Sequence, residues 1–316
     1  MPQNFPEMWV NRVELNLTTA TEAPWLAGIQ ELDTAILEVG SGSASEQNII
    51  HIPNTDFEVD VLINNEAYPI ALQAYTDADV TIQLDKYQTK VVTLSDDQVT
   101  GASYRRIDAA TALMTRSILI KKYGKAIWAL APAANGAFTP VVQTSGKRSE
   151  QENPIVENGR TILVYADIVA MKDKFDKMEV PMAGRRLVLC SDHWNDLLLD
   201  RKRFGDMLVN YKTGDPAPVI AGFEIYQYIN NPLFDGTNKL AYGAVAADGQ
   251  FQGSVAFYVS QIAIKTGFTK QYFAPSNLDP ENQTNRLAYR HYFICVPKRV
   301  KYIGAIASTY SPGNPA

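Results

Sequence analysis

The sequence predicts an α+β protein, and two kinds of periodicity carry that prediction. Apolar and polar residues alternate in several stretches between residues 57 and 94 and between residues 219 and 307, which is typical of strands. Apolar residues spaced by three and four mark a long helix over residues 103–130, and shorter helices are expected after Thr161 and Ser191. Strands and helices in this mixture indicate a layered α+β fold.

The composition is that of a folded chain of 316 residues, long enough for one large domain or two modest ones. Hydrophobic residues make up 46% and charged residues 20%, which excludes wholesale disorder. Two cysteines cannot form a disulfide framework, and three scattered histidines leave little for a histidine-based metal site. We expect neither a signal peptide nor a membrane span, because no basic leader and no stretch of about 18 apolar residues is present.

Charge is distributed unevenly along the chain. The first 100 residues hold sixteen acidic and three basic residues, a net charge of −13, and the remaining residues carry +8. The overall charge is only −5, so the chain as a whole is not expected to bind polyanions strongly. The asymmetry suggests that acidic and basic regions meet each other, although ordinary solvated charge is the alternative.

The first hundred residues are expected to extend away from any core. Residues 1–45 contain few apolar residues and predict an arm, with a short helical candidate at Ile29–Leu37. Residues 80–84 and 90–94 predict two strands of a projecting hairpin, with Asp85–Gln88 as its turn. Such a hairpin has little apolar surface of its own and would need a partner to be stable.

The long helix over residues 103–130 combines a narrow apolar stripe with a wide basic face. The stripe consists of Ile107, Ala110, Met114 and Ile118. The basic residues are Arg105, Arg106, Arg116, Lys121, Lys122 and Lys125. Gly124 and Pro132 limit the length of the helix, and a connection rich in Gly, Pro and Ser follows at residues 133–154.

A second unit begins near Ile155. Thr161 is expected to cap a helix that ends before Pro181, and Ser191–Asp192 to cap another that runs to Leu208. Between these helices the apolar run Leu187–Cys190 predicts a buried strand. Further strands are expected at Val219–Tyr228, Val255–Lys265, Asn285–Val296 and, after a break at Pro297, Val300–Ala307.

No catalytic, cofactor or metal site is expected. Gly146–Ser149 resembles the end of a phosphate loop, but Val141 stands where the first glycine would be required. The cluster Cys190–His193 contains nucleophile and base, yet neighbours at a strand-to-helix junction diverge, so Cys190 is expected to fill the core. The alternating carboxylates of residues 56–60 are interpreted as a solvated strand face rather than a cation site. The roles of Cys190 and Cys295 stay open.

The order of these elements resembles the major capsid (coat) protein of tailed bacteriophages, whose fold is also seen in cellular encapsulins. The segments that carry the resemblance are Leu163–Arg186, Leu187–Trp194, Gly222–Tyr226 and Tyr289–Tyr302. The resemblance implies an N-terminal arm at residues 1–45, an extended hairpin loop at 46–100, a peripheral domain with a spine helix at 101–153, an axial domain at 154–256, and a return to the peripheral domain with a tail at 257–316.

The resemblance also implies a structural, non-catalytic subunit that assembles in the host cytoplasm into the icosahedral head of a double-stranded DNA phage. Its partners would be copies of itself in hexamers and pentamers, a separate scaffolding protein, a portal, possible decoration proteins, and packaged DNA through weak non-specific contact. No membrane and no cofactor are implied. An encapsulin-type shell protein is the alternative, followed by a hydrolase built on Cys190 and His193, or a receptor-binding or tail β-protein.

The charge asymmetry predicts where subunits touch. The acidic first 100 residues of one subunit are expected to lie on basic surface of its neighbours. The candidate contact residues are Lys86, Lys90, Arg105, Arg106, Arg116, Lys121, Lys122 and Lys125. Some relatives also crosslink a hairpin lysine to an asparagine, but no motif identifies partners for Lys86 or Lys90, so that chemistry is not expected here.

Overall fold

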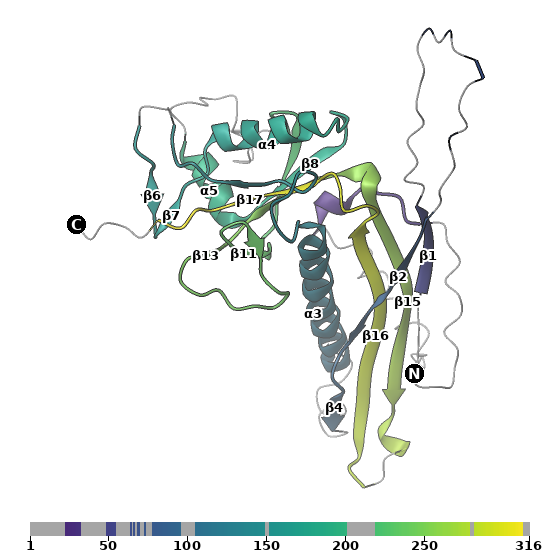
Figure 1. The fold of residues 1–316 in the computed structure, drawn as a ribbon. Coiled ribbons are helices and arrows are strands. Elements are labelled where there is room, and N and C mark those ends of the chain that lie inside the picture. The colour runs from purple at the N-terminus through teal and green to yellow at the C-terminus, as the bar shows by residue number, and fades with distance from the viewer. Residues whose placement is uncertain are drawn as a thin grey trace.

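A computed structural model of the chain shows two halves that meet beside the upper end of a long helix (Figure 1). One half is a six-stranded sheet with two helices, and the other is an elongated four-stranded sheet packed against the long helix. The structure describes residues 23–32, 49–54, 78–95, 105–148, 152–200, 219–278 and 281–311, with a few single positions between 64 and 73.

The elongated half is built on two very long antiparallel strands, β15 (Ile262–Ala274) and β16 (Thr284–Pro297). The free edge of β16 pairs with two short strands, β3 (Asp85–Gln88) and β4 (Val92–Ser95). Helix α3 (Arg105–Leu130) lies against β16, which confirms the predicted helix. Met114 and Ile118 of its apolar stripe are buried, because strands that alternate apolar and polar residues present one apolar face to a helix. Ala110 is half-buried, and the side chain of Ile107 lies outside the described part of the structure.

The carbonyl groups at the C-terminal end of helix α3 accept hydrogen bonds from a lysine of another element. The Lys239 ammonium donates hydrogen bonds to the carbonyl oxygens of Trp128 at 2.9 Å and Ala131 at 2.6 Å. It also lies 4.1 Å from the centre of the Trp128 ring. A cation at a helix C-terminus is favoured by the helix dipole. The helix itself has no basic residue in its last turn, so a distant strand supplies the cap.

The predicted hairpin over residues 80–94 is wrong. Asp85–Gln88 is the strand β3 rather than a turn, and both β3 and β4 pair with β16. The hairpin that does form joins β1 (Ile49–Asn54) to β2 (Ala78–Gln83) in antiparallel register. Alternation in a sequence identifies a strand but not its partner, and here the partner of β3 is about two hundred residues away. Lys86 and Lys90 therefore lie beside α3 and not at a hairpin tip.

The compact half is a mixed sheet in the order β5-β17-β14-β8-β10-β9. Its strands are β5 (Val141–Gln143), β8 (Arg185–Leu189), β9 (Val219–Ile220), β10 (Phe223–Gln227), β14 (Ser254–Tyr258) and β17 (Ile303–Ala307). The predicted strand at Leu187–Cys190 is confirmed as β8, which lies in the middle of this sheet. Strand β17 was expected to return to the peripheral domain, and the structure instead places it between β5 and β14.

Two helices, α4 (Tyr165–Lys177) and α5 (Ser191–Leu199), flank this sheet (Figure 1). Neither begins at the predicted cap. Thr161 is a buried strand residue, and the Asp167 carboxylate instead accepts the Val164 N–H at 3.0 Å. Ser191 is the first residue of α5, after Cys190. Helix α5 ends at Leu199, and the predicted continuation to Leu208 lies outside the described residues.

The remaining elements are short. They are η1 (Pro24–Leu26), β6 (Val156–Glu157), β7 (Arg160–Thr161), β11 (Leu233–Asp235), β12 (Asn238–Lys239), β13 (Gln250–Gln252), η3 (Val259–Gln261) and η4 (Ser276–Leu278). Within the predicted arm, Trp25 is fully buried against Tyr228 and Phe257, at ring-centre distances of 5.7 and 6.3 Å. Ala23 and Trp25 therefore belong to the core, and Leu26 and Ile29 pack against it. Glu31 bridges to Ile264 where a helix was expected. The other arm residues lie outside the described part.

Candidate functional site

The cluster Cys190–His193 at the start of α5 is an internal polar network rather than a catalytic one. The His193 ring is fully buried, with Nδ1 2.7 Å from Ser254 Oγ and Nε2 2.9 Å from Ser308 Oγ. Burial lowers the pKa of His193 to about 4, so the ring is neutral at physiological pH. Both ring nitrogens are used in holding α5 to β14 and to the end of β17.

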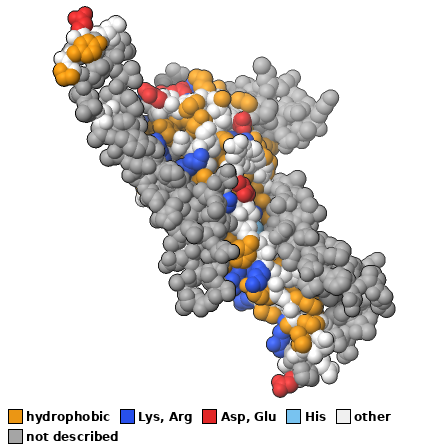
Figure 2. All heavy atoms as spheres, turned by 90° about the vertical axis from the view of Figure 1, so that its right-hand side faces the viewer, with side chains coloured by type: hydrophobic (Ala, Val, Ile, Leu, Met, Phe, Trp, Pro, Cys, Tyr) orange, Lys and Arg blue, Asp and Glu red, His pale blue; other side chains and the backbone are white. Residues whose placement is uncertain are grey.

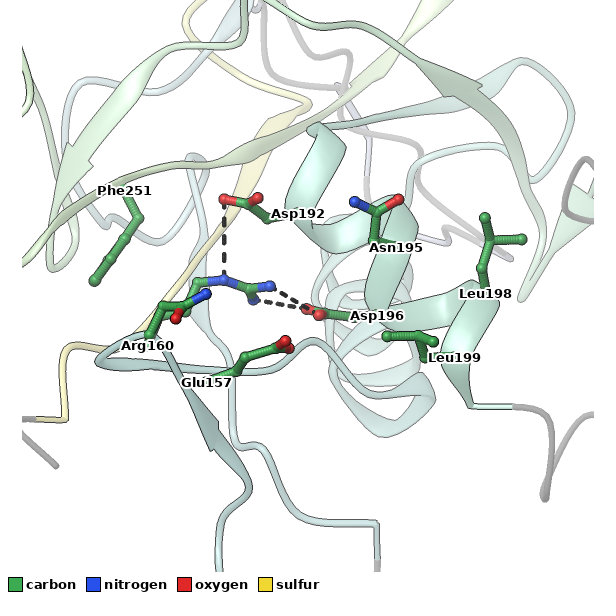
Figure 3. A pocket seen from close by; sticks show the side chains of 9 residues that line it. Glu157, Arg160, Asp192, Asn195, Asp196, Leu198, Leu199 and Phe251 are labelled. Carbon is green, nitrogen blue, oxygen red and sulfur yellow. Dashed lines mark hydrogen bonds and ion pairs between the residues drawn. The ribbon is translucent and has the colours of Figure 1, made fainter. Parts of the chain in front are cut away.

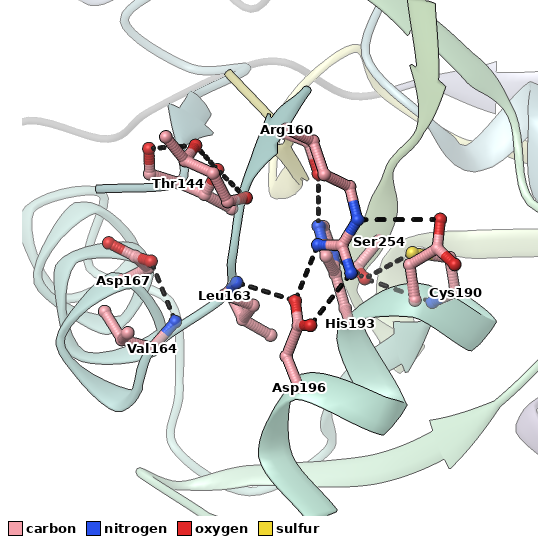
Figure 4. Close-up of polar contacts among 12 residues, drawn as sticks. Thr144, Arg160, Leu163, Val164, Asp167, Cys190, His193, Asp196 and Ser254 are labelled. Carbon is pink, nitrogen blue, oxygen red and sulfur yellow. Dashed lines mark hydrogen bonds and ion pairs between the residues drawn. The ribbon is translucent and has the colours of Figure 1, made fainter. Parts of the chain in front are cut away.

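Cys190 has the opposite properties from an activated nucleophile. Its thiol is buried, and burial raises its pKa to about 11. The Cys190 N–H donates to Ser254 Oγ at 3.1 Å (Figure 4). The thiol lies 3.5 Å from the Gln252 carbonyl oxygen. Reactive cysteines are exposed thiolates with a lowered pKa. Cys190 is a packing residue, as the sequence indicated.

Beside this network, Arg160 and Asp196 form a buried bidentate ion pair. The two N–O distances are 2.7 and 2.8 Å, and Asp196 also accepts the Leu163 N–H at 2.8 Å (Figure 4). The pair forms the floor of a pocket of about 450 Å³, and Asp192 stands 3.9 Å from the guanidinium on its other side (Figure 3). This bidentate pair anchors strand β7 to helix α5.

An open groove runs between α3 and the strands β3 and β4. Its volume is about 600 Å³, and Lys86, Lys90 and Lys121 lie along it. Its apolar lining includes Val92, Ala110, Leu113, Met114 and Ile118. Leu113 is 66% exposed, although it is a large aliphatic side chain. An apolar surface with basic residues along it suits a segment in which apolar and acidic side chains alternate. We call this surface the α3 groove.

Seven of the eight predicted contact residues divide into three groups. Lys86, Lys90, Arg116 and Lys121 are exposed. Lys125 is half-buried and forms an ion pair with Asp85 of its own chain at 2.6 Å. Arg105 and Arg106 begin α3, and their side chains lie outside the described part of the structure.

The prediction of a continuous basic face on α3 is wrong at Lys122, which is buried. Its side chain is only 4% exposed, and its ammonium lies 4.2 Å from the centre of the Phe293 ring. The helical period places Lys122 one position after Lys121, on the side of α3 that faces β16. Lys122 is thus an internal residue and not a candidate for contact with another subunit.

Sequence reasoning identified Ala110, Met114 and Ile118 as an apolar stripe but did not single out Leu113, a largely exposed apolar residue of the α3 groove. Leu113 lies beside the apolar stripe of α3 that packs on β16. The helical period of the sequence therefore indicated that Leu113 would be exposed. Basic side chains are not confined to this groove. Figure 2 shows Lys and Arg lying among hydrophobic side chains on another face, which is the right-hand side of Figure 1. In the described ranges no three metal-ligating side chains come together, and no helix is long and apolar enough to cross a membrane.

An elongated α+β subunit with internal polar networks and an open groove has the features of a protein that works by contacting other subunits. Residues 76–308 match the family described as phage capsid protein. This match covers more than half of the chain, so the chain belongs to the phage capsid protein family. No curated protein matches it significantly.

Solved structures show the same fold at low sequence identity. The mature capsid of bacteriophage PhiM1 is 13% identical, with a TM-score of 0.56, over 88% of this chain and 92% of that one. The capsid of Ralstonia phage GP4 is 8% identical, with a TM-score of 0.59, over 86% of each chain. A virus-like particle from Pyrococcus furiosus is 8% identical, with a TM-score of 0.53, over 95% and 98%. The chain is a major capsid protein, a structural subunit of a phage shell.

Proposed function

We propose that this chain assembles with itself into hexamers and pentamers of a head that encloses double-stranded DNA. The observation that carries the proposal is the match of residues 76–308 to the capsid family, together with the open groove on α3. Electron microscopy of the purified, concentrated protein tests it. Closed shells, tubes or isolated capsomers are expected, and a protein that stays monomeric at every concentration would contradict the proposal.

An encapsulin-type compartment is the second candidate, favoured by the likeness to the Pyrococcus furiosus virus-like particle along nearly the full length of both chains. The two functions differ in what the particle contains. Particles isolated from the native source are expected to hold double-stranded DNA if the chain forms a phage head. A protein cargo without DNA would support the compartment instead.

Further partners are proposed on general grounds. A shell of this kind needs a portal for DNA entry, and a separate scaffolding protein and decoration proteins would assist assembly in the host cytoplasm. The overall charge of −5 supports only weak, non-specific contact with packaged DNA, because a strongly basic wall would hold the genome. We propose no catalytic role, since the Cys190 thiol is buried and has a raised pKa.

The α3 groove is the proposed contact between subunits. The acidic first 100 residues of one copy would lie on the exposed basic residues of a neighbour. In the groove these residues are Lys86, Lys90 and Lys121. Arg105, Arg106 and Arg116 of α3 are proposed as further contact residues outside the groove lining. Exposed ion pairs contribute at most about 1 kcal/mol each, but a shell repeats them in every subunit. The contact should therefore govern assembly rate and its salt dependence more than final affinity.

A charge reversal in the groove tests this contact. Lys121→Glu is expected to slow assembly and to weaken its dependence on salt, while the free subunit stays folded. Lys174→Glu, an exposed residue of α4, changes the net charge equally and is the matched control. Assembly is followed by light scattering between about 0.05 and 0.5 M salt, a range in which the Debye length falls from well above to well below about 10 Å. Equal rates for the two variants would place the contact elsewhere.

A further inference from the structure

The elongated sheet has a second face, turned away from α3, and basic side chains gather on it. Side chains alternate between the two faces of a strand. Tyr289 of β16 is buried in the core cluster that α3 covers, so its neighbour Arg290 points to the other face. Lys270 of β15 lies directly opposite Arg290, and Arg286, four residues earlier on β16, shares their face. Lys270 and Arg286 are exposed and Arg290 is half-buried, so three cations lie on one side of the sheet.

The part of this face near the compact half is covered, and the part beyond it is exposed. Tyr292 of β16 is buried against Leu84 in a small apolar cluster. The Phe268 ring lies 4.8 Å from the Tyr292 ring and is 38% exposed, and Tyr272 further along β15 is also 38% exposed. Figure 2 shows Lys and Arg among hydrophobic side chains on the side of the molecule where β15 lies. We call the exposed part the β15–β16 basic face, which consists of Phe268, Lys270, Tyr272, Arg286 and Arg290.

The β15–β16 basic face holds like charges against one another. Lys270 and Arg290 are directly opposite across the ladder, an arrangement that destabilises a sheet. Both cations lie over the Tyr272 ring, whose centre is 5.5 Å from the Lys270 ammonium and 5.2 Å from the Arg290 guanidinium. The ring attracts both cations but carries no net charge to neutralise them. Within their bounds, β15 and β16 contain four basic residues and no acidic residue. An anion is therefore the partner that complements this surface.

The spacing of the cations suits the backbone of double-stranded DNA. Arg286 and Arg290 are four residues apart on one strand, which separates their Cα atoms by about 13 Å. The major groove of DNA is about 12 Å wide, so the two guanidinium groups can reach phosphates on both sides of one groove. Two cations already occupy the Tyr272 ring, which leaves its face closed to stacking with an unpaired base. Contact with phosphates of a duplex is thus the mode that this geometry favours.

We propose that the β15–β16 basic face binds the phosphate backbone of double-stranded DNA through Lys270, Arg286 and Arg290. The inference rests on the proposed shell function, because packaging is what brings DNA to the subunit. It assigns to three residues a contact that the net charge of the chain does not locate. Phosphate contacts carry no sequence information, so binding is independent of base sequence.

The salt dependence of DNA binding counts the phosphates that the protein contacts. Full-length, unassembled subunits are titrated against a fluorescent duplex of about 20 base pairs between about 0.05 and 0.3 M salt, where each contact adds about −0.9 to the slope of log affinity against log salt. Lys270→Gln is expected to weaken binding roughly tenfold at about 0.1 M salt and to make the slope shallower by about one. The double variant Lys270→Gln, Arg286→Gln should make it shallower by about two. Lys174→Gln, at an exposed position of α4, is the matched control and should keep the wild-type slope. No binding by the wild type at the lowest salt, or one slope for all four proteins, would overturn the proposal.

Stability and a second polyanion separate DNA binding from other roles of these residues. Because Lys270 faces Arg290, Lys270→Gln should leave the free subunit at least as stable as the wild type in thermal unfolding. Polyglutamate of the same total charge, titrated in place of the duplex, should bind more weakly. If it bound as tightly as the duplex and lost affinity with the same substitutions, an acidic polypeptide would be the partner and the proposal would be wrong.

Assembly is measured on the same proteins in the absence of DNA. The wild type and all variants are expected to form shells at the same protein concentration, because the β15–β16 basic face is assigned to DNA and not to a neighbouring subunit. Wild-type shells together with unchanged salt slopes would refute this inference alone. A wild type that binds the duplex with the predicted slopes but forms no shell at any concentration would contradict the shell function and leave the DNA contact supported.

Discussion

The Lys122 ammonium lies 4.2 Å from the centre of the Phe293 ring, which joins α3 to β16 through a buried cation–π contact. The ring favours the charged ammonium, while removal from water disfavours it. Burial lowers the pKa of Lys122 to about 8, so the cost of burial outweighs the attraction of the ring. One turn of the helix thus carries an exposed lysine, Lys121, and an interior one, Lys122, with different roles.

Lys122→Met is expected to leave the subunit at least as stable as the wild type at pH 7. Between pH 8 and the ordinary lysine value of 10.5, the unfolded wild-type chain holds more protons than the folded one, so wild-type stability rises with pH. The rise should be on the order of 3 kcal/mol at most, and the variant should lack it. Urea unfolding of free subunits at pH 7 and 10 measures both. Parallel pH profiles would mean that Lys122 is hydrated in the folded state.

His193 predicts a loss of stability in acid. Its pKa falls from 6.5 to about 4 on folding, so the unfolded chain binds more protons within that window. Stability should fall as the pH drops from about 6.5 to 4, by up to about 3 kcal/mol. In the His193→Asn variant, stability should fall less over this pH range. The fall that remains should come from His291, whose pKa is lowered by burial to about 3. The difference in stability between wild type and variant, measured by thermal unfolding at each pH, gives the contribution of His193 alone.

Removal of one partner of the buried Arg160–Asp196 pair should be strongly destabilising. Arg160→Ala leaves a buried carboxylate without its cation, at a cost of about 3–5 kcal/mol. Lys177→Ala, which breaks the exposed pair with Asp173 on α4, should change stability by less than about 0.5 kcal/mol. Denaturant midpoints of the two variants give the comparison. Similar midpoints would show that the Arg160 pocket is hydrated enough to screen the pair.

Two glycines should respond to alanine in opposite directions. A Cβ on Gly304 of β17 would stand 2.9 Å from the Met171 sulfur and 3.0 Å from a Phe175 ring carbon. Gly304→Ala should therefore cost about 1–3 kcal/mol through overpacking against α4. A Cβ on Gly124 would stay 3.6 Å or more from its neighbours, and Gly124→Ala within α3 should add up to about 1 kcal/mol. Thermal unfolding of both variants checks the signs, and the reverse order would contradict the packing described here.

Local patterns in the sequence predicted helices α3, α4 and α5 and the longer strands, because periodicity depends only on which face of an element is apolar. They missed many of the short strands. The helix over residues 103–130 and the strand at Leu187–Cys190 are confirmed for that reason. Partners across the fold were not predictable in this way. Strands β3 and β4 pair with β16, and β17 joins the other sheet, because register and neighbour are decided by the whole chain.

The candidate contact surface was predicted in part. The concentration of basic residues on α3 follows from the sequence, and Lys121 is exposed as expected. The interior position of Lys122 depends on the packing of β16, and the pocket lined by Gly124 and Tyr242 depends on a loop that returns to α3 from more than a hundred residues away. Both features arise from contacts between distant segments, for which single-sequence patterns carry no information.

The place of β17 between β5 and β14 has a consequence for the synthesis of the subunit. The compact sheet stays in two pieces until residue 307 has left the ribosome, because its second strand in spatial order is its last in sequence. A chain that terminates early leaves the β14 edge unpaired and Met171 of α4 without the strand that it covers. Only chains translated through residue 307 can complete this sheet, so we expect chains that terminate earlier to be excluded from assembly.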